Sequence, residues 1–183
     1  VANDLAPEGY EVVVFEALPR AGGLMRTNIP SFRLPAEVID DEIGMIVEMG
    51  VEVRYNTRIE SMKKLLDSGE FDAVFVGTGA PKGKELDIPG RKEGAANIHI
   101  GIEWLESLHF GHIDSVGKRV LVIGVGNTAM DCCRSAKRLG AKDVKVMARR
   151  TRPYFKASPW ELEDAEGEQV DIIVNHAPQK FVV

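Results

Sequence analysis

A glycine-containing turn between a predicted strand and a predicted helix constrains this chain most. Residues 119–123 have the β-branched composition of a buried strand, and residues 127–139 have the spacing of an amphipathic helix that Gly140 ends. The two are joined directly by Gly124-Val-Gly126-Asn-Thr-Ala129. A Gly-x-Gly-x-x-Gly/Ala string alone is weak evidence, but between a strand and a helix it indicates a Rossmann dinucleotide-binding unit.

Each small residue of this turn has a separate physical role in such a unit. Gly124 permits the tight turn, Gly126 lets a pyrophosphate approach the backbone, and Ala129 lets the helix pack closely on the strand. The free N–H groups at the helix N-terminus then face the phosphates. We therefore expect the following residues to lie along a bound dinucleotide: Gly124, Gly126, Asn127, Thr128 and Ala129.

The end of the next strand indicates which nicotinamide nucleotide binds. An NAD site usually has Asp or Glu there, which accepts a hydrogen bond from the ribose 2′-hydroxyl. In this chain the strand at 144–147 runs into Ala148, Arg149 and Arg150, and no acid is present. Two guanidinium groups suit the 2′-phosphate of NADP(H). The alternative is a solvated pair of arginines at the end of a strand.

Strand-like and helix-like segments alternate along the whole chain. Such alternation predicts an α/β fold with parallel sheets that are covered on both faces. Helices are expected at 35–49, 60–67, 101–109 and 127–139, and Ser158-Pro-Trp-Glu161 is predicted to be a capping box that opens a further helix. Strands are expected at 11–15, 51–55, 71–76, 119–123, 144–147 and 170–174.

Composition excludes several classes of protein. The net charge of −5 and the lack of a basic stripe argue against a nucleic-acid partner, and no apolar run is long enough to cross a membrane. The adjacent Cys132 and Cys133 suit neither a disulfide framework nor a metal site, so we expect core packing and a reducing, cytoplasmic setting.

A second, incomplete nucleotide site is indicated near the start of the chain. Glu16 ends the strand at 11–15, where an acid suits the ribose hydroxyls of a dinucleotide, although exposed glutamates at strand ends are common. Pro19-Arg-Ala-Gly22-Gly23-Leu24 resembles the loop that follows this acid in flavoproteins with two dinucleotide sites. Gly77-Thr78-Gly79-Ala80 resembles their second flavin-side turn.

Longer segments resemble one family, that of the glutamate synthase small subunit. It includes the electron-input part of dihydropyrimidine dehydrogenase and the large subunits of ferredoxin:NADP oxidoreductases. Residues 22–35 look like its flavin loop, and residues 126–134 also resemble it, as does Arg149-Arg150 followed by Ala157-Ser-Pro and an acidic helix. The matches extend from about residue 10 to about residue 180.

The resemblance implies an enzyme that passes a hydride from NADPH to FAD and electrons on to an iron–sulfur domain or a large subunit. The cofactors supply this chemistry, so no catalytic side chain and no metal ligand are predicted. Arg33 would lie near the isoalloxazine, or else form a surface salt bridge, and Asp131 is expected on a helix surface without a role. Carried over by position, the FAD contacts would be Glu16, Arg20, Gly22, Gly23, Leu24, Arg33, Thr78, Gly79 and Ala80.

The family pattern divides the chain into a partial FAD-binding domain (1–80), a connector (81–117) and an incomplete NADP(H)-binding Rossmann domain (118–183). The first flavin-side strand and its glycine turn are not found, so the sequence is interpreted as an internal fragment of a two-dinucleotide-binding flavoprotein, truncated at both ends. We expect it to be inactive alone, to bind FAD poorly, and to expose sheet edges that favour a homodimer. A non-catalytic nicotinamide-nucleotide-binding module is the alternative; a flavin disulfide reductase is disfavoured because no Cys-x-x-x-x-Cys motif is present.

Overall fold

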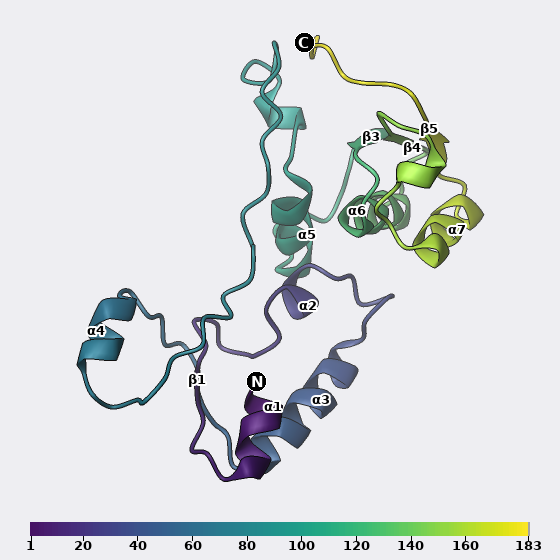
Figure 1. The fold of residues 1–183 in the computed structure, drawn as a ribbon. Helices are drawn as coiled ribbons and strands as arrows, with labels where there is room; N and C mark the ends of the chain where they lie inside the picture. The colour runs from purple at the N-terminus through teal and green to yellow at the C-terminus, as the bar shows by residue number, and fades with distance from the viewer. Residues whose placement is uncertain (183) are drawn as a thin grey trace. The chain divides into compact units, whose positions relative to one another are not determined.

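The computed structural model describes residues 1–182, which form two compact units (Figure 1). The first comprises residues 1–26 and 31–80, and the second comprises residues 27–30 and the chain from Pro81 onwards. Val183, the last residue of the predicted nicotinamide domain, lies outside the described residues.

The first unit is built on two short parallel strands. Val14 of one pairs with Val53 of the other, and Ile39 and Val51 are its buried apolar side chains. The elements before Ala80 are α1 (Ala2–Leu5), η1 (Ala6–Glu8), β1 (Val13–Phe15), α2 (Gly23–Thr27), α3 (Ala36–Glu48), β2 (Glu52–Arg54) and α4 (Met62–Asp67). The expected strand–helix–strand order is confirmed, with β1 and β2 shorter than predicted.

Two expectations for this unit are wrong. The flavin loop expected at 22–35 contains the short helix α2, and residues 71–76 form no strand. A strand exists only when its backbone pairs with another, and no described residue offers 71–76 a ladder. Phe71 still packs edge-to-face on Phe15 of β1, with the ring centroids 5.7 Å apart, but Phe75 is 71% exposed.

The second unit contains a three-stranded parallel sheet with the order β3-β4-β5. Arg119 pairs with Asp143, and Lys145 pairs with Asp171, so the carboxyl ends of the three strands lie at one edge. Helices α6 and α7 connect successive strands and lie on one side of the sheet (Figure 1). The elements are η2 (Ala95–Asn97), α5 (Gly101–His109), β3 (Arg119–Ile123), α6 (Asn127–Arg138), β4 (Asp143–Met147), η3 (Arg152–Tyr154), α7 (Pro159–Gly167) and β5 (Asp171–Ile173).

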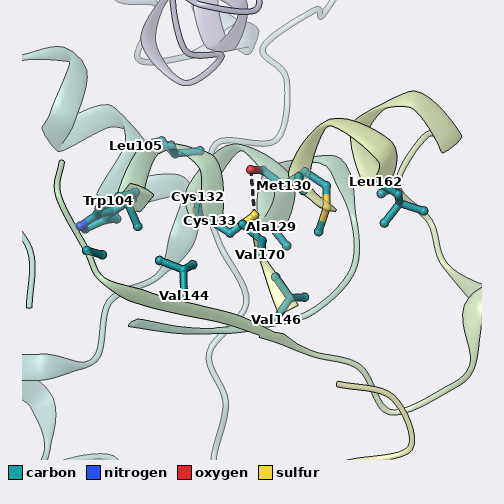
Figure 2. Packing of buried hydrophobic residues seen from close by; sticks show 14 residues of the cluster. Trp104, Leu105, Ala129, Met130, Cys132, Cys133, Val144, Val146, Leu162 and Val170 are labelled. Carbon is teal, nitrogen blue, oxygen red and sulfur yellow. Dashed lines mark hydrogen bonds between the residues drawn. The ribbon is translucent and has the colours of Figure 1, made fainter. Parts of the chain in front are cut away.

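The core of this unit lies between the sheet and helices α5, α6 and α7. Val144 and Val146 point from β4 towards Met130 and Cys133 of α6 (Figure 2). On the opposite face of the sheet, Leu121 is 50% exposed. The predicted α/β class with parallel sheets is therefore confirmed. Helices were expected on both faces of the sheet, but within residues 1–182 they cover only one face of the β3-β4-β5 sheet.

The two cysteines belong to this core, as their positions on the helix predicted. Both are free thiols, and the Cys133 thiol donates to the carbonyl oxygen of Met130 at 3.2 Å (Figure 2). Burial raises the pKa of Cys132, and it raises the pKa of Cys133 to about 12. Thiols held neutral in this way are poor nucleophiles, so a packing role is consistent with both residues.

Helices long and apolar enough to traverse a lipid bilayer are not found within residues 1–182.

Candidate dinucleotide-binding site

The glycine turn stands at the carboxyl edge of the sheet. Gly124 follows the last residue of β3 with φ of +125°, a backbone conformation that favours glycine, and its N–H donates to the carbonyl oxygen of Met147 at 3.0 Å. Gly126 is the N-cap of α6, and no side chain caps this helix. Asn127 and Thr128 follow as exposed residues, so the 12-residue helix begins at the surface, and its first N–H groups receive no side-chain cap.

Gly126 differs from Gly124 in a way that bears on ligand binding. Its φ is −105°, which any residue adopts, and a Cβ built on it would meet no described atom within 4 Å. Neither the backbone nor packing within residues 1–182 therefore requires glycine at this position. A glycine that neither backbone conformation nor packing requires is consistent with the close approach of a phosphate group from outside the chain.

Ala129 lies one turn further along α6 and has a structural position. It is buried in the core cluster beneath the turn. A small side chain at this point lets the helix approach the sheet closely, which is the role expected from the motif.

Arg149 and Arg150 follow β4 after the buried Ala148, and both are exposed. The guanidinium carbon of Arg150 lies 5.4 Å from the ring centroid of Tyr154, a cation–π distance. Within residues 1–182 neither arginine makes a hydrogen bond or an ion pair with a protein group. Both charges are thus available to an anion, unlike that of Arg152, which pairs with Glu166.

The segment that carries these arginines, which we call the arginine loop (residues 149–158), is tied to the glycine turn. The carbonyl oxygen of Val125 accepts the N–H groups of Lys156 and Ala157, each at 3.0 Å. The N–H of Ser158 donates to Asn127 Oδ1 at 2.8 Å, and Asn127 Nδ2 donates to Ser158 Oγ at 3.4 Å. The fold therefore joins the two predicted halves of the nicotinamide site and adds the exposed cation Lys156, which the sequence analysis missed.

The predicted capping box at Ser158 is wrong, although α7 does begin at Pro159. The Ser158 side chain makes no capping hydrogen bond, because its hydroxyl meets Asn127 instead. Glu161 is also engaged elsewhere, since its carboxylate accepts from Arg134 at 3.3 Å. Tertiary partners on α6 outcompete the local pattern at both ends of the box.

The expectation that Asp131 lies on the surface of α6 is wrong, and Arg134 of the same helix is buried as well. Asp131 and Arg134 are each less than a tenth exposed. Arg134 forms ion pairs with Glu161 and Asp164 of α7 and with Glu168, the C-cap of that helix, at 3.3, 2.9 and 2.9 Å. These pairs fix α7, and with it the end of the arginine loop, against α6.

On the flavin side, several candidate residues are held by their own unit. Glu16 is half-buried, and one of its carboxylate oxygens accepts the N–H of Leu18 at 2.8 Å. Arg20 pairs with Asp40 of α3 at 2.9 Å. The buried Arg26, which the sequence analysis did not select, donates to the same carboxylate and to the carbonyl oxygen of Ala21. The loop from Arg20 to Arg26 is therefore anchored on α3.

The two adjacent glycines of this loop, Gly22 and Gly23, differ in their structural surroundings. Gly22 has φ of +124°, and a Cβ there would lie 3.0 Å from Ile39 Cγ2. Gly23 has φ of +49° and starts α2, in which Leu24 is exposed. Packing against α3 thus accounts for Gly22 without a ligand.

The remaining flavin-side candidates are Arg33 and residues 78–80. Arg33 is half-buried and engaged in an interaction within the protein. Thr78, Gly79 and Ala80 are exposed, and Gly79 has φ of +71°.

Comparison with known proteins places the chain in a family. The family model for pyridine nucleotide-disulphide oxidoreductases matches residues 1–182. The NADP(+)-dependent formate dehydrogenase subunit beta of Moorella thermoacetica is 41% identical over 92% of this chain and 24% of its own length. The glutamate synthase [NADPH] small chain of Azospirillum brasilense is 34% identical over 98% of this chain and 40% of its own length.

A solved structure shares the fold. FprA from Mycobacterium tuberculosis in complex with NADPH has a TM-score of 0.74 at 20% sequence identity, covering 91% of this chain and 44% of that one. This chain spans less than half the length of each of these proteins. The resemblance to the glutamate synthase small subunit is confirmed, and the chain belongs to the pyridine nucleotide-disulphide oxidoreductase family.

Proposed function

We propose that the second unit binds NADP(H) as part of an NADPH-dependent, FAD-linked oxidoreductase. The observation that carries this proposal is the exposed pair Arg149 and Arg150, which has no ionic partner within residues 1–182 and is tied beside the glycine turn. A 2′-phosphate carries a charge that two guanidinium groups can bind with bidentate hydrogen bonds.

The glycine turn would bind the other charged part of the same nucleotide. The uncapped N-terminus of α6 presents backbone N–H groups and the positive end of a helix dipole to the pyrophosphate. Gly126 would permit the approach, and Asn127 and Thr128 flank it. The names of the two relatives compared above agree with this nucleotide, since one contains NADP(+) and the other contains NADPH.

The first unit would contribute part of an FAD site. Glu16 keeps one carboxylate oxygen without a protein hydrogen bond within residues 1–182, which suits a ribose hydroxyl. Gly23, Leu24, Arg33 and residues 78–80 would complete the contacts, whereas Arg20 would act through its ion pair with Asp40. When bound, FAD accepts a hydride from NADPH and releases single electrons.

The electrons would pass to an iron–sulfur domain or a larger subunit. Both curated relatives are named as one component of a larger enzyme, a beta subunit or a small chain. The two free thiols suit a reducing compartment, and we place the protein in the cytoplasm.

Titration calorimetry of the purified protein with NADP⁺ and with NAD⁺ tests the nucleotide assignment. We expect tighter binding of NADP⁺, and a loss of about 100-fold in its affinity in Arg149→Ala/Arg150→Ala, because two charge-assisted contacts are removed. The affinity for NAD⁺ should change less than about threefold. Equal affinities for the two nucleotides in the unaltered protein would refute the assignment.

A matched control removes the same charge elsewhere on the sheet. Lys118 and Lys142 are exposed and lie at the amino edge, opposite the turn. Lys118→Ala/Lys142→Ala should leave the NADP⁺ affinity unchanged. Because this chain is expected to be inactive alone, turnover is measured on the full-length protein to which it is proposed to belong. NADPH oxidation there with FAD and an artificial acceptor supports the oxidoreductase, and nucleotide binding without turnover supports the non-catalytic module.

A further inference from the structure

One residue of the glycine turn makes its side-chain contacts with the protein itself. The motif would place Asn127 along the dinucleotide, yet its amide group meets Ser158, which is 31 residues away in the sequence. Oδ1 accepts the backbone N–H of Ser158 at 2.8 Å, and Nδ2 donates to the Ser158 hydroxyl at 3.4 Å. The shorter of these contacts has the ordinary length of a backbone N–H hydrogen bond.

These contacts close a loop that is already held at several points. At its start, the N–H of Ala148 donates to the carbonyl oxygen of Ile173 in β5. In its middle, Arg152 pairs with Glu166 of α7, and Arg150 lies over Tyr154. At its end, Lys156, Ala157 and Ser158 all bond to the segment 125–127. The position of the two exposed arginines relative to the turn therefore depends on this last attachment.

We propose that Asn127 and Ser158 form a latch that holds the arginine loop in place for the 2′-phosphate, so that Asn127 is a positioning residue for nucleotide selectivity. This proposal rests on the assignment of the second unit as an NADP(H) site. Asn127 acts through Arg149 and Arg150, whose guanidinium groups are brought to the phosphate already ordered. Pre-ordering lowers the entropy lost on binding, and only a nucleotide with a 2′-phosphate gains from it.

The proposal differs from a direct phosphate contact in a measurable way. An asparagine that binds the pyrophosphate contributes equally to NADP⁺ and NAD⁺, because both contain it. A latch contributes to NADP⁺ alone. The ratio of the two affinities in Asn127→Ala therefore separates the two roles.

Calorimetry of Asn127→Ala should show a loss of about tenfold in NADP⁺ affinity and less than about twofold in NAD⁺ affinity. Ser158→Ala keeps the backbone N–H that Asn127 accepts and removes only the longer contact, so its NADP⁺ loss should be about two- to threefold. The double variant Asn127→Ala/Ser158→Ala should bind NADP⁺ as tightly as Asn127→Ala does, since the same contact cannot be lost twice. Equal losses for both nucleotides in Asn127→Ala would overturn the latch in favour of a direct pyrophosphate contact.

A second measurement needs no nucleotide. Trypsin can cleave after Arg149 and Arg150, and a released loop should be cut several times faster in Asn127→Ala than in the unaltered protein. Asn97→Ala, an exposed asparagine in η2, is the matched control and should change neither cleavage nor affinity. Alanine favours helix formation at position 127, so faster cleavage at an unchanged melting temperature reports the loop and not the loss of α6.

The two measurements distinguish a failed latch from a failed nucleotide assignment. If the unaltered protein shows no preference for NADP⁺ but Asn127→Ala accelerates cleavage, the NADP(H) assignment falls and the structural attachment stands. If the unaltered protein prefers NADP⁺ but cleavage and the affinity ratio are unchanged in Asn127→Ala, the latch is refuted and the assignment stands.

Discussion

Replacing Arg134 with methionine should destabilise the second unit by about 3–5 kcal/mol, because the change leaves a buried carboxylate without its cation. The side chain of Arg134 is 8% exposed, and that of its partner Glu161 is 4% exposed, with the two joined at 3.3 Å. Two further carboxylates also face Arg134, but Asp164 is mostly in water and Glu168 retains Arg138. Most of the cost therefore comes from Glu161.

This magnitude is a large part of the stability of a domain, which is about 5–15 kcal/mol. Urea unfolding followed by the fluorescence of the buried Trp104 measures it, in a Trp160→Phe background that removes the exposed second tryptophan. The midpoint should fall while the slope stays constant. Arg138→Met, at a half-exposed position on the same helix, is the control and should cost less than about 1 kcal/mol.

The double variant Arg134→Met/Glu161→Leu decides whether the reasoning is correct. It removes both buried charges and keeps apolar side chains of similar length, so most of the lost stability should return. If the double variant is as unstable as Arg134→Met or less stable, the loss does not arise from an uncompensated Glu161, and the argument is refuted.

Three further predictions concern Gly126, the two cysteines and Glu168. Gly126→Ala should leave the melting temperature unchanged or slightly raised, because a Cβ meets no described atom and alanine restricts the unfolded chain, whereas the NADP⁺ affinity measured by calorimetry should fall at least about tenfold. Cys132 and Cys133 should react with iodoacetamide at pH 8 only after unfolding in urea. Burial raises the pKa of Cys133 to about 12 in the folded protein, compared with about 8.5 in the unfolded chain. The contribution of Cys133 to stability is therefore present below about pH 8.5 and is lost as the pH rises towards 12. Burial acts to raise the pKa of Glu168, but hydrogen bonds from Arg138 and Arg134 outweigh it and lower the pKa below its usual value of 4.5. The contribution of Glu168 to folding stability is therefore present above pH 4.5 and is lost as the pH falls through the folded pKa. In Glu168→Gln the free energy of unfolding should fall less steeply at acid pH than in the unaltered protein.

The sequence predicted those parts of the fold whose signals are local. A few residues suffice to predict strand β3, the turn and α6, because their β-branched composition, glycines and helical spacing are local signals. The same holds for β4 and α5, whose bounds agree closely with expectation. These segments also have partners in the described chain, so nothing opposes the local preference.

The errors arise where a partner distant in sequence decides the outcome. Residues 71–76 have strand composition, but composition cannot supply the neighbour to which a strand must bond. Arg134 has the polarity of a surface residue, yet three acids from α7 and its cap cover it. Ser158 and Glu161 have the spacing of a capping box, yet both side chains meet α6. Helical periodicity cannot foresee these pairings, because each depends on how two helices are placed by the sheet.

The candidate site shows why a motif glycine is informative only after its cause within the protein is known. Gly22 and Gly126 are both motif positions, and the sequence gives them equal weight. In the structure a side chain at Gly22 would meet Ile39, and its positive φ already favours glycine, so folding alone accounts for the residue. At Gly126 neither the backbone nor any described neighbour requires glycine, so its cause must lie in something that approaches from outside. The flavin-side glycine is thus weak support for a ligand, whereas the nicotinamide-side glycine, beside two arginines without ionic partners in residues 1–182, is strong support.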